Sequence, residues 1–136
     1  MKIITHVVAA VASGLVMWIV AGVWHEIAAA TFYAERLGGE HQGVALILIG
    51  YVLLGAIMAV LYPLLDLPGN TIARGLLFGA IIGLIWVLPH GLVDAAVHGQ
   101  SMLYEIQNGA WHLVEQSIGG LIVAYTYAKF RMEPKR

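Results

Sequence analysis

Histidine and carboxylate side chains recur at helical spacing in the second half of the chain. His90, Asp94 and His98 stand at every fourth position, so on a continuous helix they form one stripe. His112 and Glu115 are three positions apart and also share a helix face. Neutral imidazole and carboxylate together are a usual ligand set for zinc, iron or copper. We therefore expect these five residues to form a metal site.

Two other chemistries fit the same kinds of residue. A b-type haem needs axial ligands, and His25 and His90 each end an apolar run, so they are the expected axial pair. Proton handling needs ionisable groups held near lipid, and for it we name Glu115, His112 and Glu26. A polar belt at the level of the lipid headgroups, without any cofactor, is the alternative interpretation.

The composition indicates a membrane protein. The chain has 136 residues, of which 60% are hydrophobic and 11% are charged. Soluble domains carry about 25% charged residues, and a fold of this length cannot hide so much apolar surface from water. A formal net charge of −1 offers no basic surface, so we expect a lipid bilayer and no nucleic acid as partner. The lack of cysteine excludes disulfides and thiolate metal sites.

Four apolar runs approach the roughly 20 residues that a helix needs to cross a bilayer. They extend from Ile3 to Trp24, from Val44 to Leu65, from Ile72 to about Leu88 and from about Ala110 to Ala128. The sequence therefore predicts an all-α fold with four transmembrane helices. The first run is about twice as long as the core of a signal peptide, so we expect a retained span. Residues 66–70 are predicted to form a tight turn, with Asn70 capping the next helix.

The distribution of lysine and arginine predicts the orientation in the membrane. These cations gather at the two termini and the short turn: Lys2, Arg74, Lys129, Arg131, Lys135 and Arg136. The positive-inside rule then places both termini in the cytoplasm of a multi-pass inner-membrane protein. Segments 26–43 and 91–109, with the histidines and carboxylates, should face the periplasm or outside. Each segment is expected to begin as a helical extension of the preceding span or as a short helix in the interface, the second one ending at Gly99.

An internal duplication is indicated when the chain is aligned with itself. Segment His25–Tyr62 lies over His90–Tyr127 without a gap, and the matching residues include His25/His90 and Tyr62/Tyr127. This predicts one domain over residues 1–136 built from two parallel helical hairpins, about 1–66 and 71–130, with a basic tail at 131–136. Glycines at every fourth position, Gly75, Gly79 and Gly83, predict close packing of the third span. Tryptophans and tyrosines near the span ends, Tyr62 and Tyr127 among them, are expected in an aromatic belt.

Three functions remain open on these grounds. The first is a redox or metal-handling protein that binds a metal ion or haem b at its outer face. The second is a small proton- or cation-coupled transporter or channel, because Glu115 would lie about 7 Å inside a span that begins near Ala110. Spans one and two offer few polar interior residues for such a path. The third is a non-catalytic subunit of a homo-oligomer or a larger membrane complex, and an enzymatic role of the metal site stays undecided.

Overall fold

The computed structural model describes residues 2–24, 44–99 and 101–130, which are helical apart from short turns. The helices are α1 (Lys2–Val23), α3 (Val44–Leu61), α4 (Thr71–His98) and α5 (Met102–Lys129), and a 3-10 turn, η2 (Tyr62–Leu64), follows α3. The prediction of an all-helical chain is confirmed over these residues.

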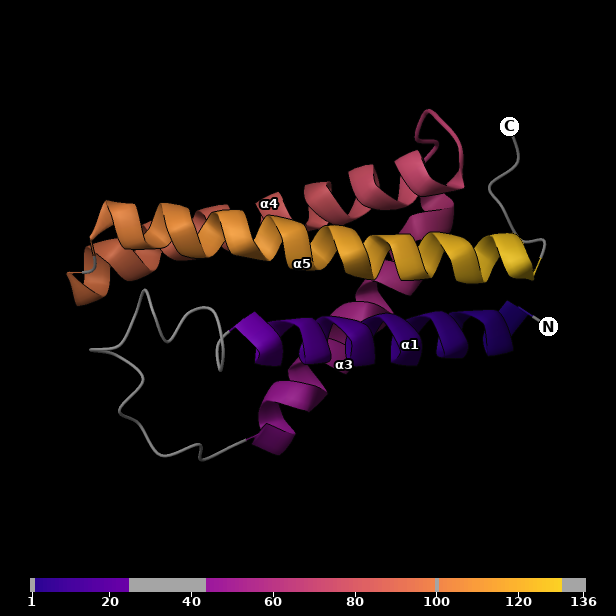
Figure 1. Ribbon diagram of the computed structural model, residues 1–136, viewed down its shortest axis with the longest axis horizontal. Helices are drawn as coiled ribbons and strands as arrows, with labels where there is room; N and C mark the ends of the chain where they lie inside the picture. Colours follow the sequence, from indigo (N-terminus) through magenta and orange to yellow (C-terminus); the bar gives the residue numbers. More distant parts are fainter. Residues whose placement is uncertain (1, 25–43, 100, 131–136) are drawn as a thin grey trace.

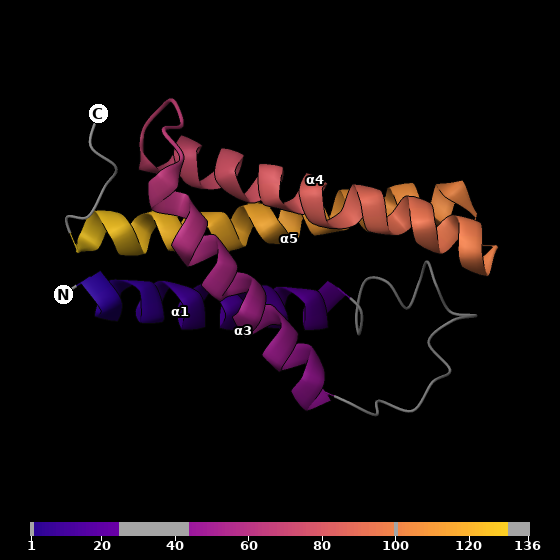
Figure 2. The same cartoon turned by 180° about the vertical axis from the view of Figure 1, so that it is seen from behind.

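The four helices form one bundle with α5 at its centre. Helices α1, α4 and α5 run side by side along the long axis, and α3 crosses them obliquely (Figures 1 and 2). Helix α5 packs against α4, α1 and α3, and α1 also packs against α3. The start of α1 and the end of α5 lie at one end of the bundle, and α4 turns into α5 at the opposite end (Figure 1).

Three of the helices are long and apolar enough to cross a membrane: Lys2–Val23, Ala45–Leu64 and Thr71–His98. Their outer faces carry exposed aliphatic side chains, as on α1, where Ile3, Val7, Val11, Leu15 and Ile19 repeat at every fourth position. Exposed apolar surface of this extent is typical of a protein surrounded by lipid. The described helices are therefore compatible with a membrane protein.

Helix α5 differs from the predicted fourth span. It begins at Met102 instead of near Ala110, because the Ser101 hydroxyl caps it by accepting the N–H of Tyr104 at 3.1 Å. It is also more polar than the other three helices. Its carboxylates Glu105 and Glu115 are buried among protein side chains, so they do not face lipid. Glu115 lies near the middle of the helix, about 20 Å from its first residue at 1.5 Å per residue.

The predicted ends of α4 are confirmed. The Asn70 side chain accepts the N–H of Ala73 at 2.9 Å and so caps the first turn. Gly99 ends the helix in the left-handed conformation, with φ at 65°. The helical extension beyond Leu88 is also confirmed, since α4 continues to His98.

The glycines on α4 permit close contact with α5, as predicted. A Cβ atom on Gly75 would lie 2.7 Å from the Cα atom of Leu121, and one on Gly79 would overlap the backbone of Gln116 and Ser117. Only glycine leaves room for the two backbones at these positions.

The assignment of Tyr62 and Tyr127 to an aromatic belt was wrong. Both rings are buried, and their centroids lie 5.3 Å apart. The hydroxyl of Tyr127 donates to the carbonyl oxygen of Ala59 at 2.6 Å. In a continuing helix that carbonyl would accept the N–H of residue 63, which is Pro63 and has none. Tyr127 therefore supplies the missing donor inside an apolar core.

Candidate functional site

The carboxyl group of Glu115 lies in the interior of the bundle, with 0% of the residue exposed. Its Oε2 atom accepts a hydrogen bond of 3.0 Å from the hydroxyl of Tyr51 on α3. Its Oε1 atom accepts a second one, also of 3.0 Å, from the amide nitrogen of Gln116. Both oxygens therefore have donors, which a buried carboxylate needs.

His112 is the third neighbour of this carboxyl group. Its Nδ1 atom lies 3.6 Å from Oε2 of Glu115, within reach of an ion pair but too far for a hydrogen bond. The Nδ1 atom is buried and has no hydrogen-bond partner among the described residues. The side chain is still 18% exposed, so other atoms of the ring reach the surface. We call Glu115, Tyr51, Gln116 and His112 the Glu115 cluster.

A groove of about 470 Å³ lies beside the Glu115 cluster. Three members of the cluster line it, namely Tyr51, His112 and Gln116. The remaining lining is apolar or aromatic and comes from α3 and α4: Ile47, Gly50, Leu53, Leu54, Ile57 and Trp86. The volume is in the range of small-molecule sites.

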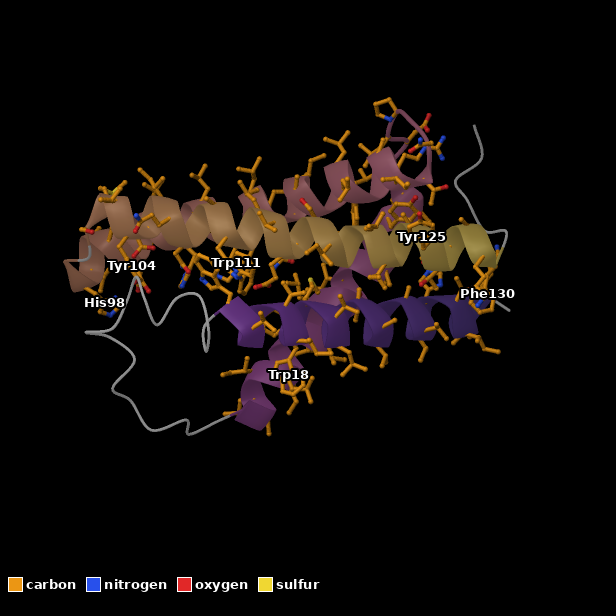
Figure 3. All side chains as sticks on the ribbon, in the orientation of Figure 1. Trp18, His98, Tyr104, Trp111, Tyr125 and Phe130 are labelled. Atoms are coloured by element: carbon orange, nitrogen blue, oxygen red, sulfur yellow. The ribbon has the colours of Figure 1, made fainter. Side chains whose placement is uncertain are left out.

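Two tryptophans stack next to His112. The rings of Trp24 and Trp111 are nearly parallel, with centroids 4.3 Å apart. Figure 3 shows Trp111 on the side of α5 that faces the end of α1. This stack joins the residue after α1 to α5, one residue before His112.

The structure does not gather the five predicted metal ligands in one place. His112 and Glu115 lie inside the bundle, whereas His98 lies at the end where α4 meets α5 (Figure 3). His98 Nδ1 is 2.7 Å from Oδ1 of Asp94, and His90 stacks on Trp86 with ring centroids 6.5 Å apart.

Over the described residues, no three histidine or carboxylate side chains come together as a metal site. His25 and Glu26 lie outside the described residues. The five-residue metal site and the haem pair His25 and His90 therefore stay predictions.

Sequence reasoning missed two members of the Glu115 cluster and one further buried carboxyl group. Tyr51 is a polar group of span two that the sequence analysis did not name, and its contact with Glu115 joins residues far apart in the sequence. Gln116 has an ordinary amide whose role only its neighbours reveal. Glu105 was expected in the outer segment 91–109 with no buried role, but it is buried on α5 near Gly91. Its burial follows from the early start of α5, which the sequence did not indicate.

Comparison of the chain with models of protein families, with characterised proteins and with solved structures finds no match. The contacts of the Glu115 cluster nevertheless define its chemistry. A carboxyl group and an imidazole stand close together, both able to bind a proton. The carboxyl group is buried in the bundle, and the imidazole borders the groove.

Proposed function

We propose that this protein is a small proton-coupled membrane transporter in which Glu115 takes up and releases the proton. The observation that carries the proposal is the full burial of Glu115 between α3 and α5, with a donor on each carboxyl oxygen. An ionisable side chain at such a place is costly, and in membrane proteins such residues mark proton and substrate pathways.

A proton in the Glu115 cluster can be bound by either of two groups, the carboxyl group of Glu115 or the imidazole of His112. When the proton is on the carboxyl group, the site contains a neutral acid beside a neutral imidazole. When the proton is on His112, an imidazolium faces a carboxylate at 3.6 Å. Tyr51 and Gln116 hold the carboxylate in that second form, because each donates a hydrogen bond to it. The proton can therefore move without leaving an unpaired charge in the bundle.

His112 connects the buried carboxyl group with the groove. Its Nδ1 edge faces Glu115, and the side chain also lines the groove. A proton that reaches the Glu115 cluster from outside the bundle thus meets the imidazole before it meets the fully buried carboxyl group. We assign to His112 the role of proton relay and to Glu115 the role of proton-binding site.

The proposed orientation has both termini in the cytoplasm and the α4–α5 connection at the outer face. In its support, the start of α1 and the end of α5 lie at the same end of the bundle (Figure 1). Lys2, Arg74 and Lys129 belong to helix ends or first turns there. The proposed pair of parallel hairpins is supported by the packing of α1 on α3 and of α4 on α5.

Proton flux into liposomes tests this function. Purified protein is reconstituted into liposomes that contain a pH-sensitive dye, and a membrane potential is imposed. We expect Glu115→Gln to reduce the flux to that of empty liposomes and Glu105→Gln to retain it, because Glu105 lies outside the Glu115 cluster. Wild-type flux in Glu115→Gln would contradict the proposal.

A metal-binding role is a second candidate, supported by the contact between Asp94 and His98. The short distance of 2.7 Å is that of a carboxylate orienting an imidazole, as carboxylates hydrogen-bonded to metal-binding histidines do. Elemental analysis of the purified protein tests metal binding, and its optical spectrum tests haem binding by His25 and His90. Metal or haem at about one equivalent, lost in His90→Ala, would favour this function.

Co-purification of other subunits in mild detergent would instead support the role of an accessory subunit.

A further inference from the structure

We propose that the groove beside the Glu115 cluster binds a lipophilic organic cation, and that its binding releases the proton of the cluster. The inference rests on the proposed function and names the substrate class of the same site. It follows from three features of the groove: its polar floor, its aromatic and apolar walls, and its opening toward lipid.

The floor of the groove attracts positive charge. The three polar residues that line it, Tyr51, His112 and Gln116, are the same three that contact Glu115. A ligand in the groove is thus separated from the carboxylate by a single layer of side chains. In surroundings of low dielectric constant, the attraction between unlike charges stays large across such a layer.

Gln116 adds a second, independent sign of a ligand. Its side chain is only 1% exposed, and its amide nitrogen is already used in the hydrogen bond to Glu115. The amide oxygen has no hydrogen-bond partner among the described residues. A buried carbonyl oxygen without a donor is destabilising. Because this oxygen carries a partial negative charge, a nearby cation stabilises it and an anion does not.

The walls of the groove favour a cation that is also apolar. Ile47, Leu53 and Ile57 contribute aliphatic surface, and Trp86 and Tyr51 contribute aromatic rings. Aromatic faces attract organic cations that have lost their water. A hydrated metal ion would find too few oxygen ligands on this lining. The groove thus suits a bulky cation with its charge spread over apolar groups.

The groove is open to the bilayer. Leu53, Ile57 and Trp86 are all more than half exposed, and they lie on the outer faces of α3 and α4. Since these faces are surrounded by lipid, a ligand reaches the groove most directly from within the membrane. Only a lipid-soluble cation can take this route.

The exchange balances in charge. Before the cation binds, the carboxyl group and the imidazole together hold one more proton than they do afterwards. On binding, that proton leaves for water and the carboxylate remains as the counter-charge of the cation. No covalent bond to the ligand forms, and the net charge of the site with its ligand is unchanged.

The titratable groups in contact with Glu115, among the described residues, are Tyr51 from α3 and His112 from α5. Helix α4 contributes Trp86 to the groove, with His90 stacked on it. A proton on His90 would repel the ligand near Trp86, so the pH dependence of binding is expected to persist in His90→Gln and to be lost in Glu115→Gln.

Binding of tetraphenylphosphonium, a lipophilic cation, tests the inference. Its affinity for the full-length protein in detergent is measured by equilibrium dialysis over a series of pH values. We expect binding to become tighter as the pH rises, by up to about tenfold per pH unit while the proton is displaced. In unbuffered solution, each bound cation should release about one proton. Glu115→Gln should weaken binding at least about tenfold.

A variant that fills the groove tests the binding site without changing the Glu115 carboxyl group. Gly50 lines the groove, and a Cβ atom there meets no other atom within 4 Å, so Gly50→Leu is expected to fold. Gly22 on α1 is equally open but does not line the groove, so Gly22→Leu is the matched control. We expect Gly50→Leu to lower the affinity at least about tenfold and Gly22→Leu to leave it unchanged.

The outcomes separate this inference from the proposed function. Equal affinity in the wild type, Gly50→Leu and Glu115→Gln would overturn the inference, as would binding that does not depend on pH. If tetraphenylphosphonium does not bind while the infrared band of the Glu115 carboxyl group still titrates, only this inference fails. If that band does not titrate, the proposed function fails too.

Discussion

The hydroxyl of Tyr51 on α3 donates a hydrogen bond of 3.0 Å to Oε2 of Glu115 on α5. This bond is a polar link between two helices whose other described contacts are few. It couples the position of α3, which forms much of the groove, to the state of the buried carboxyl group. A change of charge on Glu115 is therefore expected to alter the packing of α3.

Tyr51→Phe removes this donor and leaves Oε2 of Glu115 without a hydrogen bond. Because the acceptor is buried and ionisable, we expect a loss of about 2 kcal/mol in the free energy of unfolding. Unfolding in detergent micelles measures it. Tyr125→Phe is the matched control, since Tyr125 is 49% exposed, and it should change the stability by less than about 0.5 kcal/mol. Equal effects of the two substitutions would argue against the link.

Tyr127→Phe tests the second buried tyrosine. The substitution leaves the carbonyl oxygen of Ala59 without a donor, because Pro63 cannot replace the Tyr127 hydroxyl. We expect unfolding to become easier by about 1–3 kcal/mol, with no change in proton flux, since this contact lies outside the Glu115 cluster. Unchanged stability would show that the carbonyl finds another donor.

Gly79→Ala tests the close approach of α4 and α5. The added methyl group would overlap backbone atoms of Gln116 and Ser117, which cannot move aside as a flexible side chain can. We expect a destabilisation of about 1–3 kcal/mol, again measured by unfolding in micelles. Gly50→Ala, at a position with open space, should be neutral or slightly stabilising because alanine favours the helix. Similar stability of the two variants would contradict this packing.

His112→Gln tests the relay. If the imidazole passes protons to and from Glu115, its loss should slow protonation of Glu115 after a rapid change of pH by roughly a hundredfold. The amount of proton bound at equilibrium by Glu115 should remain. Time-resolved infrared spectroscopy distinguishes the two quantities. An unchanged rate would assign the relay to another group.

The sequence predicted the helices well because their signals are local. Apolar runs of spanning length, an Asn70 cap and the helix stop at Gly99 each depend on residues close together in the chain. The glycine contacts of α4 were also predictable, because glycines at every fourth position align on one face. The start of α5 was misplaced, since the predicted span was bounded by its apolar run, whereas the Ser101 cap begins the helix earlier.

The Glu115 cluster could be predicted only in part. The proximity of His112 and Glu115 follows from their spacing on one helix. The contact with Tyr51 depends on how α3 crosses α5, and no local pattern encodes that crossing. Tyr62 and Tyr127 show the same limit. A tyrosine near a span end suits a headgroup belt, and only the missing N–H of Pro63 explains why Tyr127 is buried.

The protonation of Glu115 itself is the most direct test of the account. Infrared difference spectroscopy of the full-length protein in lipid records the C=O band of a protonated carboxyl group as the pH is varied. The account predicts a band that appears reversibly on acidification, is absent in Glu115→Gln and persists in Glu105→Gln. A carboxyl band that titrates identically in the wild type and in Glu115→Gln would contradict it.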